Sequence, residues 1–408
     1  MLKKTILLAF TALFGLLGFA QTVSHPTCNG SRYWNEDYTP NITPNVVFGQ
    51  NVSQNGQNTT LKMDIYEPTG DNVTARPLAI FAFGGSFIGG TRTTADMIAF
   101  CEKFSKLGFV TATIDYRLGV NIFQADSFEL ARAVMRATHD MRAAIRFFMK
   151  DAYTTNTYRI DTNYIFVGGT SAGAVTALLA AYLDKESDAP QYILDIANGW
   201  GGLAGTSGNP GYNTPIKGVL NLAGCLSDKS FMADGGPDLC SMHGTLDDVV
   251  PYGHEMLVFS GVFNIKVVDG SGALHPFAQS AGINARLYPW QGGGHVPYVS
   301  DPLYMDTTLN YMRAFLYEEM CGSPTGIAEG LKTSDFAVYP NPTLDKLTIR
   351  NDYAAGEAFL LDITGKNVAS YALPVGETEI SVAQLPKGLY IVNIQSGGRQ
   401  YSKKIEVR

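Results

Sequence analysis

The residues Val167–Ala174, VGGTSAGA, decide how the rest of the chain is interpreted. They place Ser171 between Gly169 and Gly173, in the pattern Gly-x-Ser-x-Gly. The apolar residues before this pattern predict a buried strand. The segment after Ser171, AGAVTALLAAYL, is rich in Ala and Leu and has no charge, so it predicts a buried helix. Small flanking residues let such a strand and helix approach closely, which strains the serine backbone. The alternative is an ordinary glycine-rich turn, since so short a pattern often occurs by chance.

Apolar runs of strand length alternate with stretches of helical periodicity from about Leu61 onward. This alternation predicts an α/β fold, a mostly parallel sheet with helices on both faces. A helix is predicted from about Ser127 to Lys150, where apolar residues recur at helical spacing. The predicted strands are LKMDIYE (61–67), PLAIFAFG (77–84), GFVTATIDY (108–116), NYIFVGG (163–169), IKGVLNLAG (216–224), DLCSMHG (238–244) and NARLYPW (284–290).

The length of 408 residues allows one large core and a small second unit. Residues 1–20 have the layout of a secretory signal peptide, with two lysines, an apolar run and the ending Gly-Phe-Ala. Residues 322–334 are predicted to be a polar linker. Residues 335–408 contain only short strand-like runs between turn signals such as Pro-Asn-Pro, which predicts a small all-β sandwich. The α/β domain is therefore expected over residues 21–321.

The charge and hydropathy of the chain argue against several kinds of partner. Loss of the leader's two lysines changes the formal net charge from -7 to -9, and no long basic run remains. Nucleic acid is therefore not expected as a partner. No stretch after the leader approaches the roughly 18 apolar residues of a membrane span, so no transmembrane anchor is expected in the mature chain.

Cysteine and glycine patterns give no sign of a metal or a nucleotide. The five cysteines of an exported chain allow at most two disulfides, for which we predict the pair Cys225 and Cys240, and no C-x-x-C spacing indicates zinc. Residues 198–213, NGWGGLAGTSGNPGYN, predict a loop or lid, and their irregular glycines follow no predicted strand, which excludes a dinucleotide motif. We expect no cofactor and no metal ion.

A serine hydroxyl needs a nearby base, and that base needs an acid to orient it. On a strand-turn-helix of this kind the acid and then a histidine follow the serine in the chain. Asp247 and Asp248 lie where the strand DLCSMHG ends, at the sheet edge where ligands bind. His295 follows the last predicted strand on the glycine loop QGGGH, and imidazole transfers protons near neutral pH. The other histidines, of which His254 is expected to begin a helix, are assigned surface or structural roles: His25, His139, His243, His254 and His275.

A nucleophilic serine also needs N–H donors for the charge that develops on a carbonyl oxygen. The stretch FAFGGSFIGG (81–90) ends a predicted strand, and its glycines expose backbone N–H groups to a ligand. We predict an oxyanion hole formed by the N–H groups of Gly85, Ser86 and Ala172. The alternative is an ordinary glycine turn at the end of a strand.

Four motifs in this order, FGGSF, GTSAG, HGTLDDVVP and GGGH, resemble those of α/β-hydrolase carboxylesterases, especially the hormone-sensitive-lipase-like and type B groups. The resemblance covers about residues 45–318 and implies an eight-stranded, mostly parallel sheet. It also implies ester hydrolysis through an acyl-enzyme, with Ser171 as nucleophile, His295 as base and then acid, and Asp247 rather than Asp248 as the orienting acid. Phe83 departs from the pattern, because these families usually have histidine there.

The tail VYPNPTLDKLTI, LLDITGKNV, LPKGLYIVNI and KKIEV resembles the type A C-terminal sorting domain of type IX secretion, over about residues 333–408. This resemblance implies export across both membranes of a Gram-negative cell, with the type IX secretion machinery as partner. The mature protein is expected to be secreted or attached to the cell surface.

The leading hypothesis is a secreted serine carboxylic ester hydrolase that acts on a small or polymeric external ester, such as a cell-wall carbohydrate ester, a lipid or a polyester. One alternative is a non-catalytic surface-binding protein with the same fold. Another is a serine peptidase or acyltransferase that shares the acyl-enzyme chemistry. Four aromatic residues are expected either in the core or in a substrate pocket: Phe87, Trp200, Trp290 and Tyr298.

Overall fold

The computed structural model describes residues 25–121, 126–259, 261–322, 336–362, 366–396 and 399–408. The chain divides into two compact units between residues 323 and 324, and each unit is described here by itself. The predicted signal peptide, residues 1–20, lies outside the described residues. Of the predicted linker, residues 322–334, only Gly322 is described.

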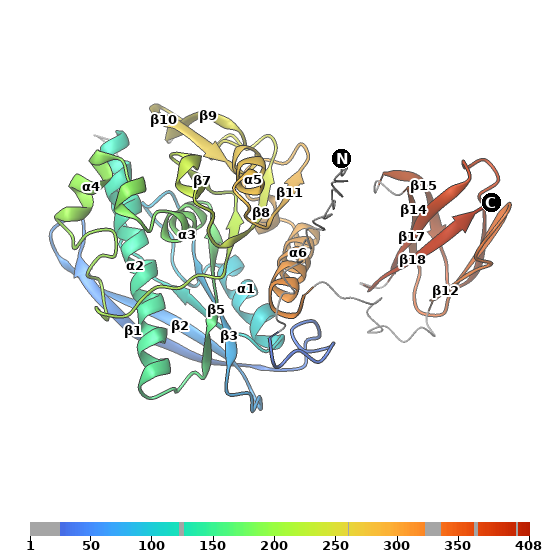
Figure 1. Ribbon diagram of the computed structural model, residues 1–408, viewed down its shortest axis with the longest axis horizontal. Helices are drawn as coiled ribbons and strands as arrows, with labels where there is room; N and C mark the ends of the chain where they lie inside the picture. Colours follow the sequence, from blue (N-terminus) through green and yellow to red (C-terminus); the bar gives the residue numbers. More distant parts are fainter. Residues whose placement is uncertain (1–24, 122–125, 260, 323–335, 363–365, 397–398) are drawn as a thin grey trace, which may run out of the picture. The chain divides into compact units, whose positions relative to one another are not determined.

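An eight-stranded sheet in the order β1-β2-β4-β3-β5-β6-β8-β11 forms the centre of the first unit (Figure 1). Strand β2 is antiparallel to both of its neighbours, and the remaining pairs are parallel. The prediction of a mostly parallel α/β sheet is therefore confirmed. The strands are β1 (Pro40–Val52), β2 (Asn58–Pro68), β3 (Arg76–Ala82), β4 (Val110–Ile114), β5 (Ile160–Thr170), β6 (Gly218–Leu222), β8 (Asp238–Gly244) and β11 (Ala285–Trp290).

The edge strand β1 is the one strand of this sheet that the sequence did not predict. Most of its side chains are exposed or partly exposed, whereas β3, β4 and β6 are buried throughout. Its pairing with β2 is also interrupted twice, between Thr43 and Val46 and between Val47 and Gly49. An exposed, bulged edge strand does not need a continuous apolar run, so hydrophobic patterning misses it.

Helices cover both faces of the sheet (Figure 1). The predicted helix at residues 127–150 is present as α2, which begins after Asp126, whose side chain accepts a hydrogen bond from the N–H of Glu129. No helix among the described residues is both long enough and apolar enough to cross a membrane. The α-helices are α1 (Ala95–Lys106), α2 (Ser127–Tyr153), α3 (Ala172–Tyr182), α4 (Gln191–Asn198), α5 (Ser271–Ser280) and α6 (Pro302–Cys321).

A small antiparallel sheet in the order β7-β10-β9 lies beyond the carboxyl end of β6 and β8. Its strands are β7 (Cys225–Leu226), β9 (His254–Phe259) and β10 (Phe263–Gly270). The prediction that His254 begins a helix is wrong, because His254 begins β9 and pairs with Asp269 of β10. The segment is too short for its periodicity to separate a strand from a helix.

The glycine-rich residues 199–213 form a loop without helix or strand, and α2 holds it in place. Arg146 donates hydrogen bonds to the carbonyls of Ala204 and Gly208, both at 2.8 Å. Arg142, fully buried, donates to the carbonyl of Leu203 and to the last carbonyls of α3. Buried guanidinium groups paired with backbone carbonyls fix the path of the loop.

The disulfide joins Cys28 to Cys321, with their Cα atoms 5.7 Å apart. The predicted Cys225–Cys240 pair is therefore wrong, and both of these thiols are free and buried. They belong to different apolar clusters, because Cys240 lies in the main core, whereas Cys225, in β7 of the small sheet, packs with Val250 and Val268. Proximity in the sequence did not predict proximity in the fold.

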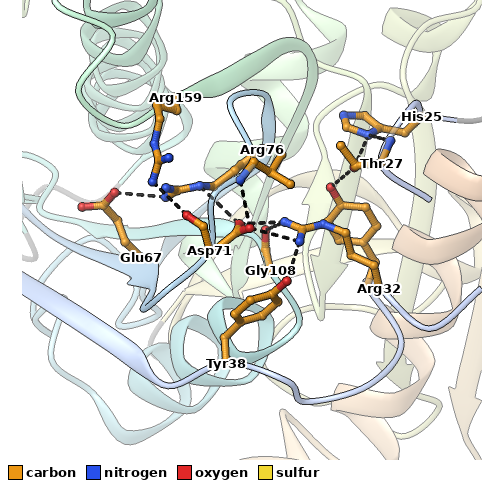
Figure 2. Close-up of polar contacts among 11 residues, drawn as sticks. His25, Thr27, Arg32, Tyr38, Glu67, Asp71, Arg76, Gly108 and Arg159 are labelled. Atoms are coloured by element: carbon orange, nitrogen blue, oxygen red, sulfur yellow. Dashed lines mark hydrogen bonds and ion pairs between the residues drawn. The ribbon is translucent and has the colours of Figure 1, made fainter. Parts of the chain in front are cut away.

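Ion pairs near this disulfide anchor the N-terminal segment of the domain (Figure 2). Arg32 donates two hydrogen bonds to the buried Asp71, at 2.7 and 3.1 Å. Arg76, which is also buried, lies 3.4 Å from Asp71 and 3.1 Å from Glu67. Figure 2 shows Arg32 and Arg76 approaching the same carboxylate from opposite sides, with Tyr38 beside Arg32. Residues before β1 are thereby joined to the body of the domain.

The second unit consists of two antiparallel sheets, in the orders β12-β13-β16 and β15-β14-β17-β18. One apolar core, which includes Val338, Leu347 and Ile394, draws side chains from both sheets. The prediction of a small all-β domain is confirmed. The strands are β12 (Phe336–Tyr339), β13 (Lys346–Asn351), β14 (Gly356–Asp362), β15 (Asn367–Leu373), β16 (Gly376–Ser381), β17 (Gly388–Ser396) and β18 (Arg399–Val407).

The double substitution Cys28→Ser/Cys321→Ser is expected to lower the free energy of unfolding by about 2–5 kcal/mol, because the bond closes a very long loop of the unfolded chain. Urea denaturation without reductant measures this loss. Reduced wild-type protein is the control and should unfold at the same urea concentration as the variant. An unchanged midpoint in the variant would contradict a stabilising role for the bond.

Candidate active site

Ser171 occupies the turn between the end of β5 and the start of α3. Its backbone has φ 53° and ψ -117°, a conformation that costs free energy in a residue other than glycine. A Cβ added to Gly169 or to Gly173 would overlap the carbonyl oxygen of Ala82 at the end of β3. The glycines on both sides of Ser171 are therefore required by the close packing of β5 and α3 against β3.

The side chains of Ser171, His295 and Asp247 form a continuous chain of hydrogen bonds. His295 Nε2 lies 2.9 Å from Ser171 Oγ, and His295 Nδ1 lies 2.7 Å from Asp247 Oδ2. An ionised carboxylate only accepts, so Nδ1 carries the proton and Nε2 is left to accept from the serine hydroxyl. Asp248 is exposed and takes no part in this chain.

The carboxylate of Asp247 is fully buried and accepts four hydrogen bonds. Its Oδ1 accepts from the N–H groups of Val249 and Val250, both at 2.9 Å. Its Oδ2 lies 2.7 Å from His295 Nδ1 and 3.1 Å from His243 Nε2. Burial opposes ionisation, but the hydrogen bonds from His243 and His295 hold the pKa of Asp247 well below its usual value. The side chain therefore carries its negative charge at neutral pH.

His243, on β8, is a buried member of the site that the sequence analysis assigned a structural role. Its Nε2 lies 3.0 Å from the carbonyl oxygen of Val250 and 3.1 Å from Asp247 Oδ2. Its Nδ1 lies 2.9 Å from Ser271 Oγ. The sequence held one signal of this contact, because His243 ends a predicted buried strand four residues before Asp247. The expected order along the chain is serine, acid and then histidine, which favoured His295, because His243 precedes Asp247.

The protonation of His243 follows from the groups behind it. Asn221 donates through Nδ2 to Ser271 Oγ and to Ser241 Oγ, both at 3.0 Å. Since Ser271 accepts from Asn221, its own hydroxyl proton is directed at Nδ1 of His243. The proton of a neutral His243 then lies on Nε2, which faces both the carbonyl oxygen of Val250 and Asp247 Oδ2. A buried hydrogen-bond chain thus continues from Ser171 through Asp247 to Asn221.

The loop after β3, where we predict the oxyanion hole, turns sharply beside Ser171. Gly85, Ser86 and Phe87 all have positive φ angles, of 127°, 55° and 60°. Ser86 and Ala172 line the same cavity as Ser171, whereas Gly85 does not line it. Ala172 is the first residue of α3, so its N–H has no acceptor within the helix.

Phe83, the residue that departs from the esterase pattern in the sequence, packs against Tyr116. Its ring stacks on the ring of Tyr116 with centroids 4.4 Å apart. The hydroxyl of Tyr116 donates to the carbonyl oxygen of Phe83 at 2.9 Å. The aromatic ring of Phe83 is thus accommodated by its contact with Tyr116.

A cavity of about 140 Å³ opens beside Ser171. It has about the size of a protein cavity that holds a benzene ring. Phe87 lines it, whereas Tyr298 is buried and donates to Thr170 Oγ1 at 2.9 Å. Trp290 packs on Tyr288 and Tyr304, and Trp200 lines a different hollow. The lining comes mainly from α2, α3, α4 and the small sheet: Leu130, Ala131, Val134, Val175, Leu179, Tyr192, Ile193, Cys225, Leu226, Leu257, Val258, Phe259, Ile265, Lys266 and Val268.

Metal ligands do not gather in the part of the chain that the structure describes. No group of three His, Cys, Asp or Glu side chains there has a geometry that could hold an ion. The histidines and carboxylates beside Ser171 are instead joined to one another by the hydrogen bonds given above.

Replacement of Gly173 by Ala is expected to destabilise the domain by roughly 1–3 kcal/mol or more, because the new methyl group meets backbone atoms that cannot rotate away. Thermal unfolding of the purified protein measures the effect. Gly199→Ala is the matched control, since a Cβ there has only one neighbour, the carbonyl oxygen of Ile196 at 3.8 Å. Equal melting temperatures for both variants would show that the close contact with β3 is not a constraint.

Comparison with known proteins gives two family matches. Residues 63–199 match the BD-FAE family model, and residues 337–408 match the secretion system C-terminal sorting domain. No curated protein matches the chain.

Solved structures similar to the chain include forms of esterase 2 from the Planctomycetes species Thermogutta terrifontis. The apo form is 20% identical, covers 72% of this chain and 100% of its own, and has a TM-score of 0.49. The native enzyme is 19% identical over 71% of this chain and 95% of its own, with a TM-score of 0.48. The form phosphorylated by paraoxon is 19% identical over 71% and 96%, with a TM-score of 0.48. The chain therefore resembles the BD-FAE family over residues 63–199 and the secretion system C-terminal sorting domain over residues 337–408.

Proposed function

We propose that the first unit is an exported serine carboxylic ester hydrolase that works through an acyl-enzyme. The observation that carries this proposal is the hydrogen-bond chain Ser171–His295–Asp247, with distances of 2.9 and 2.7 Å. The match of residues 63–199 to an esterase family supports the reaction type, and the sorting domain supports export. An esterase match together with a sorting domain supports an ester outside the cell as the substrate.

In the first half of the reaction His295 Nε2 takes the hydroxyl proton of Ser171 while Oγ attacks the ester carbonyl carbon. Asp247 stabilises the imidazolium that forms. The negative charge on the former carbonyl oxygen is stabilised by backbone N–H groups, for which Gly85, Ser86 and Ala172 are the candidates. His295 then gives the proton to the departing alkoxide, which leaves as the alcohol, and the acyl group stays on Oγ.

In the second half a water molecule gives a proton to His295 Nε2 and attacks the acyl carbon. The proton returns from His295 to Ser171 Oγ as the carboxylic acid leaves, which restores the starting state. The apolar cavity beside Ser171 excludes bulk water from one part of the ester, and this strengthens the electrostatic stabilisation of the oxyanion.

His243 is proposed as a positioning residue for this reaction. Its Nε2 lies 3.1 Å from Oδ2 of Asp247, the oxygen that also faces His295, and its N–H helps to keep Asp247 from rotating away from the imidazole. It does not touch the reacting atoms. Its contribution is the orientation of the acid, which in turn orients the base.

The same fold could bind a surface without catalysis, or could transfer the acyl group to an amine or alcohol instead of water. The hydrogen-bonded serine, base and acid favour catalysis over simple binding. The choice among hydrolysis, peptide cleavage and acyl transfer depends on the leaving group and the acceptor, which assays with an ester, an amide and an added alcohol separate.

Ser171→Ala is expected to lower kcat for p-nitrophenyl butyrate by about a millionfold, because no other group replaces the nucleophile. Release of p-nitrophenol measures the rate, and a fluorophosphonate probe should label Ser171 in the wild type alone. Ser187→Ala, an exposed residue away from the site, is the control. Full activity in Ser171→Ala would contradict the role of Ser171 as nucleophile, and no activity of the wild type on any ester would favour a binding protein.

His243→Leu is expected to lower kcat by up to about 100-fold with little change in KM, because the substrate still binds while Asp247 is less well held. His243→Gln keeps an N–H donor in a similar place and should recover most of the activity. The matched control is His254→Gln, since His254 also bonds a carboxylate, that of Asp269, but is exposed. Wild-type kcat in a folded His243→Leu protein would rule out the positioning role.

A further inference from the structure

The cavity beside Ser171 is closed on one side by the hairpin of β9 and β10. Leu257 of β9 and Lys266 of β10 are directly opposite each other in the pairing and both line the cavity. Val268, two residues after Lys266, also lines it, as expected for side chains on one face of a strand. Lys266 therefore lies on the cavity face of the hairpin, where the neighbouring side chains are apolar.

A shift in register between Asn264 and Lys266 adds one more residue to this wall. Successive residues of a regular strand face opposite sides, yet Ile265 and Lys266 both line the cavity. An extra residue in one strand bends the strand locally and changes the direction of its side chains, and such bulges occur often beside active sites. The irregularity thus adds Ile265 to the cavity wall beside Lys266, which shares one strand face with Val268.

The ammonium group of Lys266 has few polar partners within the protein. Its Nζ lies 3.4 Å from the hydroxyl of Tyr192 and 5.4 Å from the centre of that ring. Across the described ranges, no carboxylate comes within 4.0 Å of it. Asp195, one turn after Tyr192 on α4, accepts from Gln191 at 2.8 Å, and Asp269, on β10, bonds His254 at 2.7 Å.

Among the described residues that line this cavity, Lys266 is the one charged side chain, and the same cavity exposes Ser171. A cation at an apolar wall attracts an anion more strongly than a cation in open water does, because little water screens the interaction. A hydrogen bond between charged groups also contributes more to binding than one between neutral groups.

We propose that Lys266 selects esters in which the half that enters the cavity carries an anionic group, such as a carboxylate. The Tyr192 hydroxyl, beside Nζ, supplies a second donor to the same group. This inference rests on the proposed ester hydrolase activity and names the class of substrate that the site prefers. The opposing possibility is that Lys266 only covers apolar surface with its methylene groups while its ammonium faces water.

The test compares matched anionic and neutral esters in wild type and in Lys266→Met. One pair, mono-p-nitrophenyl glutarate and p-nitrophenyl pentanoate, differs on the acid side of the ester. The other pair, 4-acetoxybenzoate and phenyl acetate, differs on the alcohol side. In at least one pair, the ratio of kcat/KM for the anionic ester to that for the neutral ester should fall about tenfold or more in the variant. The pair that responds identifies which half of the ester enters the cavity.

Lys266→Arg should keep the ratio, since it keeps the charge, and added salt should lower the wild-type ratio. Lys229→Met is the matched control, because Lys229 begins the short 3-10 helix Lys229–Met232 that follows β7 and does not line the cavity. If the ratio is the same in wild type and Lys266→Met for both pairs, even where both esters of a pair react more slowly, the selection by charge is overturned. Hydrolysis of no ester by the wild type would instead overturn the proposed function, and this inference with it.

Discussion

A single backbone contact determines most of what surrounds Ser171. The carbonyl oxygen of Ala82, at the end of β3, lies against both glycines of the turn, so that β5 and α3 can approach β3 only because those residues have no side chain. The same contact brings the loop after β3 to the serine, where Gly84 packs against Ser171. The N–H of Ser171 also donates to Leu222 of β6 at 2.8 Å. The strained serine is thus held by three neighbouring strands, and the strain is sustained by the core beneath them.

Polar groups buried at the carboxyl ends of β6 and β8 complete the site. Asn221 of β6, His243 of β8 and Ser271 at the start of α5 satisfy one another and direct one N–H toward Asp247. A buried carboxylate without partners would be costly, and a partly satisfied network would be no better. Here each oxygen of Asp247 accepts two hydrogen bonds, so the charge that the imidazole needs is present and correctly oriented. Through this network the sheet holds the imidazole of His295 in one orientation.

The fold and the turn at Ser171 could be predicted because each depends on a local pattern. Asp247 and His295, which the structure places in one hydrogen-bond chain with Ser171, were predicted from chain order and, for Asp247 rather than Asp248, from the family resemblance. Buried strands give apolar runs, and the serine turn has its own signature of small residues. The edge strand β1 and the β9–β10 hairpin could not be predicted, since half-exposed strands lack such runs. The Cys28–Cys321 bond and the role of His243 depend on contacts made only after the chain has folded. The bulge at Ile265, beside Lys266, also leaves no sign in the sequence.

The bond between Cys28 and Cys321 has a topological consequence for the exported protein. It connects the segment before β1 to the last residue of α6, just ahead of the boundary between the two units. The α/β domain is therefore a covalently closed ring with the sorting domain attached outside it. Proteolysis beyond Cys321 would release the sorting domain but leave Cys28 joined to Cys321. The C-terminal end of α6 would therefore stay covalently anchored and would be protected from fraying.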